Sequence, residues 1–206
     1  DIAAFSKAFK AHFTQAPSSY RSKQVQAHTA AHMTRQQDPH TNYEKITYEL
    51  ETLPDITYLY IEYRGSYEDL EALEKVGLQL ESFAQRNDLI QEDTVILAEI
   101  MDDHEITEAI HCRYRIGISM APDHPFEPEG LFHLKTIPSA TYARFIHQGS
   151  YKSSFETYQR IFGLWMTDMT YELDDGPILE LFLNDEKETP EEDLLTAIYI
   201  PILPNP

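Results

Sequence analysis

The sequence has a single cysteine, no long apolar run and a deficit of positive charge. One cysteine, Cys112, excludes an intramolecular disulfide framework and a multi-cysteine zinc site. No apolar run approaches the ~20 residues that a membrane-spanning helix needs. The N-terminus also lacks the basic segment followed by an apolar segment that marks a signal peptide. We therefore expect a cytoplasmic protein with no membrane partner.

Acidic residues outnumber basic ones by 35 to 16 in a chain of 206 residues, which gives a net charge of −19. The charge is uneven, because Asp1 is the only acidic residue in a basic stretch over residues 1–36. The acidic remainder should repel nucleic acid, whose binding depends on neutralising phosphates. A basic head on an acidic body predicts two parts with different partners.

The first residues predict an amphipathic helix. Phe5, Phe9 and Phe13 recur every four positions and form an apolar stripe, and Lys7 and Lys10 lie off that stripe. An ordinary amphipathic helix explains the three phenylalanines as well as any specific motif does.

A more specific pattern is Phe-Ser-Lys-Ala-Phe-Lys followed by Pro17, Tyr20 and Arg21. It resembles the end of the second helix-turn-helix motif of AraC/XylS-type regulators, in which this helix lies in the DNA major groove. The resemblance implies DNA-facing roles for Ser6, Lys7 and Lys10. The chain begins inside this helix, so we expect residues 1–36 to be the C-terminal remnant of a DNA-binding domain. Such a remnant would contact DNA only in the intact regulator.

Residues 37–42 are polar and predict a linker, so a second domain is expected over residues 43–206. This domain contains an internal repeat, in which residues 53–67 match residues 137–151. The identical pairs are Pro54 and Pro138, Thr57 and Thr141, Tyr58 and Tyr142, Gly65 and Gly149, Ser66 and Ser150, and Tyr67 and Tyr151. The similarity continues with helical spacing, where Leu70, Leu73, Val76, Gly77 and Leu80 match Phe155, Tyr158, Ile161, Phe162 and Trp165.

Each repeat predicts the order strand, helix, strand, strand, with units at about residues 53–120 and 137–202. Beyond the first strand of unit one, strands are expected at residues 43–52, 94–102, 110–120, 140–148, 177–183 and 194–202, and helices at residues 67–87 and 151–169. Ser66 and Asp69 resemble a capping box at the first helix. One small sheet with one helix has little core, so the two units should pack together. The fold class is therefore α+β with two pseudo-symmetric units and antiparallel sheets.

This arrangement resembles the GyrI-like domain over about residues 43–202. The resemblance rests on Ile137-Pro138, on the segment Gln148-Gly149-Ser150-Tyr151, on Cys112-Arg113-Tyr114, on the run from Glu180 to Asp185 and on the ending from Leu194 to Ile202. It implies a cleft between the units that binds a small organic molecule, often aromatic or cationic. Behind an AraC-type head, such a domain implies a ligand sensor that modulates DNA binding in the intact protein.

Strand alternation gives candidate ligand contacts. Leu179, Leu181 and Leu183 are expected on the helix-covered face, which leaves Glu180 on the other face. By the same reasoning Ala197 and Tyr199 turn to the side of Glu180. The predicted ligand-binding residues are Glu180, Tyr142, Phe182, Tyr199, Trp165, Arg113 and Arg115. A carboxylate among aromatic rings suits an organic cation.

Other interpretations stay open. Glu180 could pair with Arg113 or Arg115, because buried carboxylates are normally paired. Ala197 and Arg115 stand where the family often has acidic residues, which leaves room for a neutral or anionic aromatic ligand. A hydrolase that activates water through Glu180 with Tyr142 or Tyr199 is one alternative, and a gyrase-inhibitor-like protein-binding module is another.

The sequence contains no catalytic triad and no motif for a metal or another cofactor. We therefore expect a binding protein without a cofactor rather than an enzyme.

Overall fold

The computed structural model describes residues 2–16, 19, 46–103, 107–121, 124–166 and 169–203. The chain divides into two units, Asp1–Lys45 and Ile46–Pro206. In the first, the expected N-terminal helix is present as α1 (Ile2–Phe13), with Lys7 and Lys10 exposed and Ser6 half-buried. The expected linker at 37–42 lies outside the described residues.

The second unit is built on a nine-stranded antiparallel sheet, and the predicted α+β class is confirmed. Eight strands follow the order β1-β6-β9-β8-β3-β4-β2-β5, and β7 pairs with β9. The strands are β1 (Glu49–Leu53), β2 (Ile56–Arg64), β3 (Ile96–Ile100), β4 (Arg113–Ser119), β5 (Phe132–Ile137), β6 (Ala140–Gln148), β7 (Glu172–Leu173), β8 (Ile178–Phe182) and β9 (Leu195–Leu203). The helices are α3 (Leu70–Arg86) and α4 (Ser154–Arg160), which continues into a π-helical segment, Ile161–Trp165. Short 3₁₀ turns lie at Ala109–His111, Tyr151–Ser153 and Glu191–Asp193.

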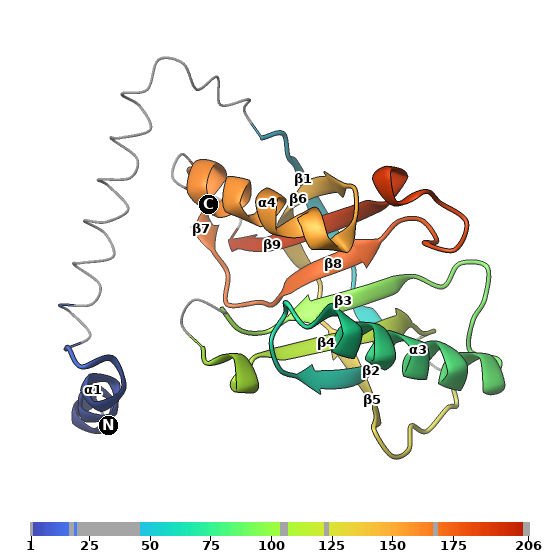
Figure 1. Cartoon of the computed structure of the whole chain (residues 1–206), viewed down its shortest axis with the longest axis horizontal. Helices are drawn as coiled ribbons and strands as arrows, with labels where there is room; N and C mark the ends of the chain where they lie inside the picture. Colours follow the sequence, from blue (N-terminus) through green and yellow to red (C-terminus); the bar gives the residue numbers. More distant parts are fainter. Residues whose placement is uncertain are drawn as a thin grey trace. The chain divides into compact units, whose positions relative to one another are not determined.

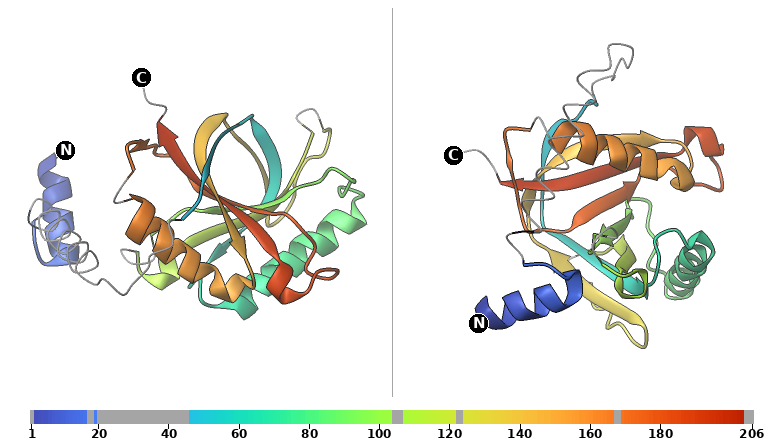
Figure 2. Two further views of the ribbon diagram at one scale, coloured as in Figure 1. Left: turned by 90° about the horizontal axis from the view of Figure 1, so that it is seen from above. Right: turned by 60° about the vertical axis from the view of Figure 1, so that its left-hand side comes forward.

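Two strand-helix-strand-strand units share this sheet, β2-α3-β3-β4 and β6-α4-β8-β9. They join where β3 pairs with β8, in a register that places Ala98 opposite Glu180. Helices α3 and α4 cover the same face of the sheet, one over each unit, with β3 and β8 between them (Figures 1 and 2). The middle of the helix-covered face is therefore shared by both units.

Apolar side chains form a core on each face of the sheet. On the helix side, α3 covers Leu59, Ile61 and Ile118, and the π-helical segment after α4 covers Ile198 and Ile200. On the opposite face, a second core contains Tyr58, Leu97, Tyr142, Leu179 and Tyr199. Both faces of the central strands are therefore buried, mostly by apolar side chains.

The side chains of strand β8 lie on the opposite faces of the sheet to those expected from the sequence. Glu180 lies opposite Ile198 in the β8–β9 pair, and directly opposed residues share a face. Because Ile198 packs in the core beneath the helices, Glu180 faces the helices too. Leu179 and Leu181 belong to the opposite core, and Leu183 is exposed beyond the end of the strand, so the predicted placement of these leucines was wrong.

Helix α3 begins with an N-cap at Asp69 rather than at Ser66, because the Asp69 carboxylate accepts a hydrogen bond from the Ala72 N–H at 3.1 Å. Ser66 instead accepts from the Glu68 N–H in the preceding turn. Replacing Asp69 by alanine is expected to lower the free energy of unfolding by about 1 kcal/mol, because the N–H loses its acceptor. Urea denaturation measures this loss. Glu74→Ala, an exposed change in the same helix, should differ from wild type by less than ~0.5 kcal/mol, and equal losses in both would contradict the capping role.

Other departures from the predicted elements are at boundaries and edges. The strand expected at 43–52 begins at Glu49, with residues 43–45 outside the described part of the chain. The helix expected over 151–169 is a succession of 3₁₀, α and π turns up to Trp165. The edge strand β5 was not predicted, since its six residues follow a proline-rich connection and give only a weak alternating pattern.

Candidate functional site

Glu180 is the buried carboxylate on the helix-covered face, in the central strand β8. Only 8% of the residue is exposed. Its Oε1 accepts a hydrogen bond from the Tyr158 hydroxyl of α4 at 2.9 Å, and its Oε2 accepts one from the Tyr114 hydroxyl of β4 at 3.4 Å. One tyrosine comes from each repeat, so both units hold the same carboxylate.

Further aromatic rings surround these two tyrosines. The Tyr67 ring lies 6.2 Å from the Tyr114 ring, and its hydroxyl donates to the Arg113 carbonyl oxygen at 2.8 Å. The Tyr151 ring contacts Phe182 edge-on at 5.4 Å. The Phe162 ring stacks on Tyr158 at 5.8 Å. We call this set the Glu180 cluster, and its members are Glu180, Tyr67, Tyr114, Tyr151, Tyr158, Phe162 and Phe182.

The electrostatics of the Glu180 cluster are set by burial. Burial raises the pKa of Glu180, and the hydrogen bonds from Tyr158 and Tyr114 oppose that rise. Burial also holds the pKa of both tyrosines well above 10.0 and raises the pKa of Tyr67 and of Tyr151 to about 12. The hydroxyls therefore remain protonated donors at neutral pH.

Glu180 has no basic partner among the described residues. The ion pairs in that part of the chain all involve other carboxylates. Two neutral donors therefore hold an acidic group that no protein cation neutralises there. This arrangement can accept a positively charged group from outside.

Tyr199 lies on the other face of the sheet, so the prediction that it shares a face with Glu180 was wrong, and Tyr142, a further predicted ligand contact, lies on that other face as well. Tyr199 neighbours Leu179 in the β8–β9 register, and both tyrosines belong to the core opposite the helices. Their rings meet edge-on at 5.8 Å, and the Tyr199 hydroxyl donates to Glu51 at 3.0 Å. A ligand at Glu180 would not contact them.

Arg113 and Arg115 also lie away from Glu180, because Tyr114 and Ile116 occupy the helix-facing positions of β4. Arg113 is held by Asp102 at 2.8 Å. Arg115 pairs with Glu62 at 2.9 Å and with the fully buried Glu99 at 3.2 Å. The alternative that either arginine pairs with Glu180 is therefore not what the structure shows.

On the face opposite Glu180, a second buried carboxylate, Glu99, is surrounded by its own set of partners. Lys135 donates to Glu99 at 2.6 Å, and the Tyr58 hydroxyl also donates to it. We call Glu99, Arg115, Lys135, Tyr58 and Glu62 the Glu99 cluster. The two buried carboxylates differ in that protein cations hold Glu99, whereas tyrosines hold Glu180.

Of the other predicted residues, Phe182 lies beside Glu180 on the same face of β8, and Trp165 is core. Trp165 is 5% exposed and packs against Tyr48 and Phe145. Tyr67, Tyr114, Tyr151 and Tyr158 were not among the residues predicted from the sequence. A signal was available for two of them, because the repeated Gly-Ser-Tyr segments end in Tyr67 and Tyr151.

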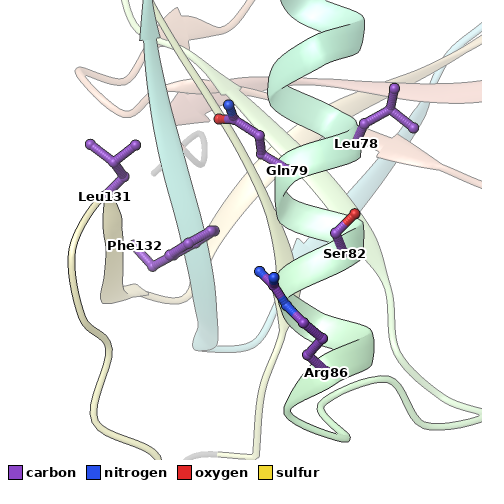
Figure 3. Close-up of a pocket in the computed structure, with 6 residues that line it drawn as sticks. All are labelled: Leu78, Gln79, Ser82, Arg86, Leu131 and Phe132. Atoms are coloured by element: carbon purple, nitrogen blue, oxygen red, sulfur yellow. The ribbon is translucent and has the colours of Figure 1, made fainter.

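Two hollows lie elsewhere on the second unit. One, of about 340 Å³, is lined by Leu78, Gln79, Ser82, Arg86, Leu131 and Phe132, between α3 and the start of β5 (Figure 3). The other, of about 230 Å³, is lined by Asp55, Ile56, Thr57, Val95, Leu97, Ser119, Met120 and Leu181. Neither includes a member of the Glu180 cluster.

Among the described residues, no group of His, Cys, Asp or Glu side chains is arranged to hold a metal ion. Within the same residues, no helix has the length and apolar character needed to cross a membrane.

Residues 46–203, most of the chain, match the GyrI-like small-molecule-binding domain. The chain belongs to this family. The match covers both strand-helix-strand-strand units, and so includes the whole Glu180 cluster. A search of curated protein sequences gives no match.

Solved structures share the GyrI-like fold. The EcmrR C-terminal domain has a TM-score of 0.62 at 15% identity, and the match covers 78% of this chain and 99% of that one. EcmrR in a DNA complex has a TM-score of 0.64 at 15% identity, and the match covers 89% of this chain and 68% of that one. SAV2435 bound to tetraphenylphosphonium has a TM-score of 0.54 at 15% identity, covering 77% and 94%. A hydrolase from Listeria innocua has a TM-score of 0.50 at 11% identity, covering 82% and 98%. At these identities the likeness establishes the fold alone.

Proposed function

We propose that the GyrI-like domain binds an aromatic organic cation at Glu180 and acts as the sensor of an AraC-type transcription regulator. The observation that carries the proposal is the buried Glu180 carboxylate, which receives hydrogen bonds from two neutral tyrosines and has no basic partner among the described residues. An organic cation would supply the missing charge, and the aromatic rings would contact its apolar groups and its charge.

Two residues that left room for a neutral or anionic ligand, Ala197 and Arg115, lie away from Glu180. Ala197 and Arg115 replace residues that are often acidic in the family, but both lie on the face opposite Glu180. Their effect on charge therefore falls on the Glu99 cluster. SAV2435, which shares the fold, was solved bound to tetraphenylphosphonium, and this supports a lipophilic aromatic cation as the ligand class.

The regulatory part of the proposal rests on the N-terminal unit. Helix α1 presents Lys7 and Lys10 to solvent, in the pattern that resembles the AraC recognition helix. EcmrR, which has the same fold in its C-terminal domain, was solved in a complex with DNA. A ligand that binds one conformation of the sensor more tightly than another would shift the regulator between DNA-binding states.

A second candidate is hydrolysis, favoured by the raised pKa of Glu180 in an enclosed aromatic environment. Tyr142 and Tyr199 cannot assist Glu180 in such a reaction, because both lie on the face of the sheet opposite Glu180. Tyr158 and Tyr114 would take their place. The two functions differ in outcome, since a sensor releases its ligand unchanged.

Acidification is expected to weaken cation binding. Protonation removes the charge of Glu180, and the pKa of this carboxyl is raised above 4.5, so the loss begins at a higher pH than for a surface glutamate. Isothermal titration calorimetry with tetraphenylphosphonium between about pH 8 and about pH 5 should show the dissociation constant rising severalfold. In Glu180→Gln the residual affinity should not change with pH.

Chromatography of a cleavable ester-bearing aromatic cation, incubated with the protein at neutral pH, separates the two candidates. The sensor proposal expects the compound to be recovered intact. Cleavage that Glu180→Gln abolishes would replace the sensor with the hydrolase. Tetraphenylphosphonium binding that is independent of both pH and Glu180 would contradict the site assignment.

A further inference from the structure

Helix α3 contains a glycine, Gly77, in its middle, where glycine is unfavourable. A helix-interior glycine is less stable than alanine because it loses more backbone freedom on folding. The backbone does not require it, since Gly77 is not among the described glycines with positive φ, which are Gly130 and Gly149. The space does not require it either: a Cβ built at this position meets nothing closer than Ile116 Cδ1 at 3.9 Å, an ordinary contact.

Gly77 lies on the flank of α3 that faces the second repeat. Residues four apart lie on the same side of a helix, and Glu81 is four residues after Gly77. Glu81 bonds to Lys187, which lies between β8 and β9. The flank that carries Gly77 and Glu81 therefore reaches the second repeat, and the α3 residues that line the hollow of Figure 3 are others: Leu78, Gln79, Ser82 and Arg86.

The residue beneath Gly77 belongs to the same row of the sheet as Glu180. Ile116 on β4 lies opposite Ala98 on β3, and Ala98 lies opposite Glu180 on β8. These three side chains share the helix-covered face and span two strand spacings, about 10 Å. In this row, the small Ala98 side chain is the one that lies between Ile116, which an added Cβ at Gly77 would just touch, and the carboxylate of Glu180.

The second helix has an aromatic ring at the equivalent position. The helical repeat matches Gly77 with Phe162. The next matched pair supports this alignment, because Leu80 and its counterpart Trp165 are both buried. Phe162 stacks on Tyr158, the hydrogen-bond donor to Glu180. The two helices therefore differ at this one position, with an aromatic ring at Phe162 and no side chain at Gly77; one turn earlier, Leu73 is the counterpart of Tyr158.

We propose that Gly77 is a specificity-determining position, which leaves room over Ile116 for an aryl arm of a multi-ring cation whose charged centre lies against Glu180. The inference rests on the proposed function and narrows its ligand class to branched, multi-ring cations. A side chain at position 77 would occupy the place of that arm. A cation with a single ring can bind at Glu180 without using this space.

The test compares two cations in wild type, Gly77→Ala and Gly77→Leu by calorimetry. Gly77→Leu should weaken tetraphenylphosphonium at least ~10-fold and change the affinity of the one-ring benzyltrimethylammonium by less than ~3-fold. Gly77→Ala should have an intermediate effect on tetraphenylphosphonium and should raise the melting temperature by about 2–4 °C, because alanine is the better helix former. Lys75→Leu adds the same side chain to the exposed side of α3 and should leave both affinities unchanged.

Equal affinity of wild type and Gly77→Leu for tetraphenylphosphonium would overturn the inference and leave cation binding at Glu180 standing. An equal loss for both cations would also overturn it. If wild type binds neither cation, the proposed function fails, and the inference fails with it. A lower melting temperature of Gly77→Ala would show that the fold itself requires the glycine, against the inference.

Discussion

Replacing Arg115 by methionine is expected to lower the free energy of unfolding by about 3 kcal/mol. Arg115 donates to Glu99, which is fully buried, and to Glu62. Removing one member of a buried ion pair leaves an uncompensated charge in the interior, which typically costs ~3–5 kcal/mol. The lower end of that range applies because Lys135 remains bonded to Glu99. Urea denaturation with a two-state fit measures the difference.

Arg64→Met is the matched control for Arg115→Met. Arg64 pairs with the same Glu62 at 2.8 Å, but its side chain is 61% exposed, so solvent screens the pair. Its loss should cost less than ~1 kcal/mol. Equal costs for the two variants would contradict the structural role given to the Glu99 cluster. At a temperature where Arg115→Met is folded, its affinity for tetraphenylphosphonium should match wild type, because Arg115 lies on the face opposite Glu180.

Replacing Glu180 by glutamine is expected to weaken tetraphenylphosphonium binding at least ~30-fold. Truncating one partner of a buried charge pair costs about 2–5 kcal/mol, and each 1.4 kcal/mol is tenfold in affinity. Glutamine keeps the shape of the side chain; its amide oxygen can accept a hydrogen bond from one of Tyr158 and Tyr114, and its amide NH2 can donate to the hydroxyl oxygen of the other. The loss measured by calorimetry therefore reports on charge rather than on packing.

The same substitution should raise the stability of the ligand-free protein. The folded-state pKa of Glu180 is raised, so its protonated form is favoured by folding, and stability falls as the pH rises through the window above 4.5. Glutamine has no charge to bury, and the gain in melting temperature over wild type should therefore grow from acid to neutral pH. Glu51→Gln, on the opposite face beside Tyr199, should leave cation affinity unchanged. A Glu180→Gln variant that binds like wild type would remove Glu180 from the site.

The architecture could be predicted from the sequence because the repeat is visible in it. Six identities between residues 53–67 and 137–151, followed by matched helical positions, indicate two similar units. Strand β6 was placed at its observed bounds, and β9 within one residue at each end. In β9, Ile198, Ile200 and Ile202 pack in the core on the helix-covered face.

The site could be predicted only in part, because the face of β8 is ambiguous. Its sequence, Ile-Leu-Glu-Leu-Phe, is apolar at every position except Glu180, so alternation alone does not distinguish the two faces of a strand buried on both. The pairing register decides, and a reversed face moves every side chain of the strand. That error placed Tyr199 on the side of Glu180.

Glu180 and Phe182, both predicted as ligand contacts, lie on one face of β8, and the residues that complete their surroundings come from distant parts of the chain. Tyr114 and Tyr158 reach Glu180 from β4 and α4, and no local pattern links them to it. Glu99 was missed as a buried group for a similar reason. Its partners Arg115 and Lys135 come from β4 and β5, and β5 was not predicted.

The most direct test of the account is calorimetry of the wild-type protein at neutral pH with two ions of nearly the same shape and opposite charge. Tetraphenylphosphonium and tetraphenylborate present the same four rings, so apolar contacts alone would bind both. A carboxylate held by neutral tyrosines predicts saturable binding of the phosphonium and no measurable binding of the borate. Equal affinity for both ions, or preference for the borate, would contradict the claim that Glu180 is the charge that selects the ligand.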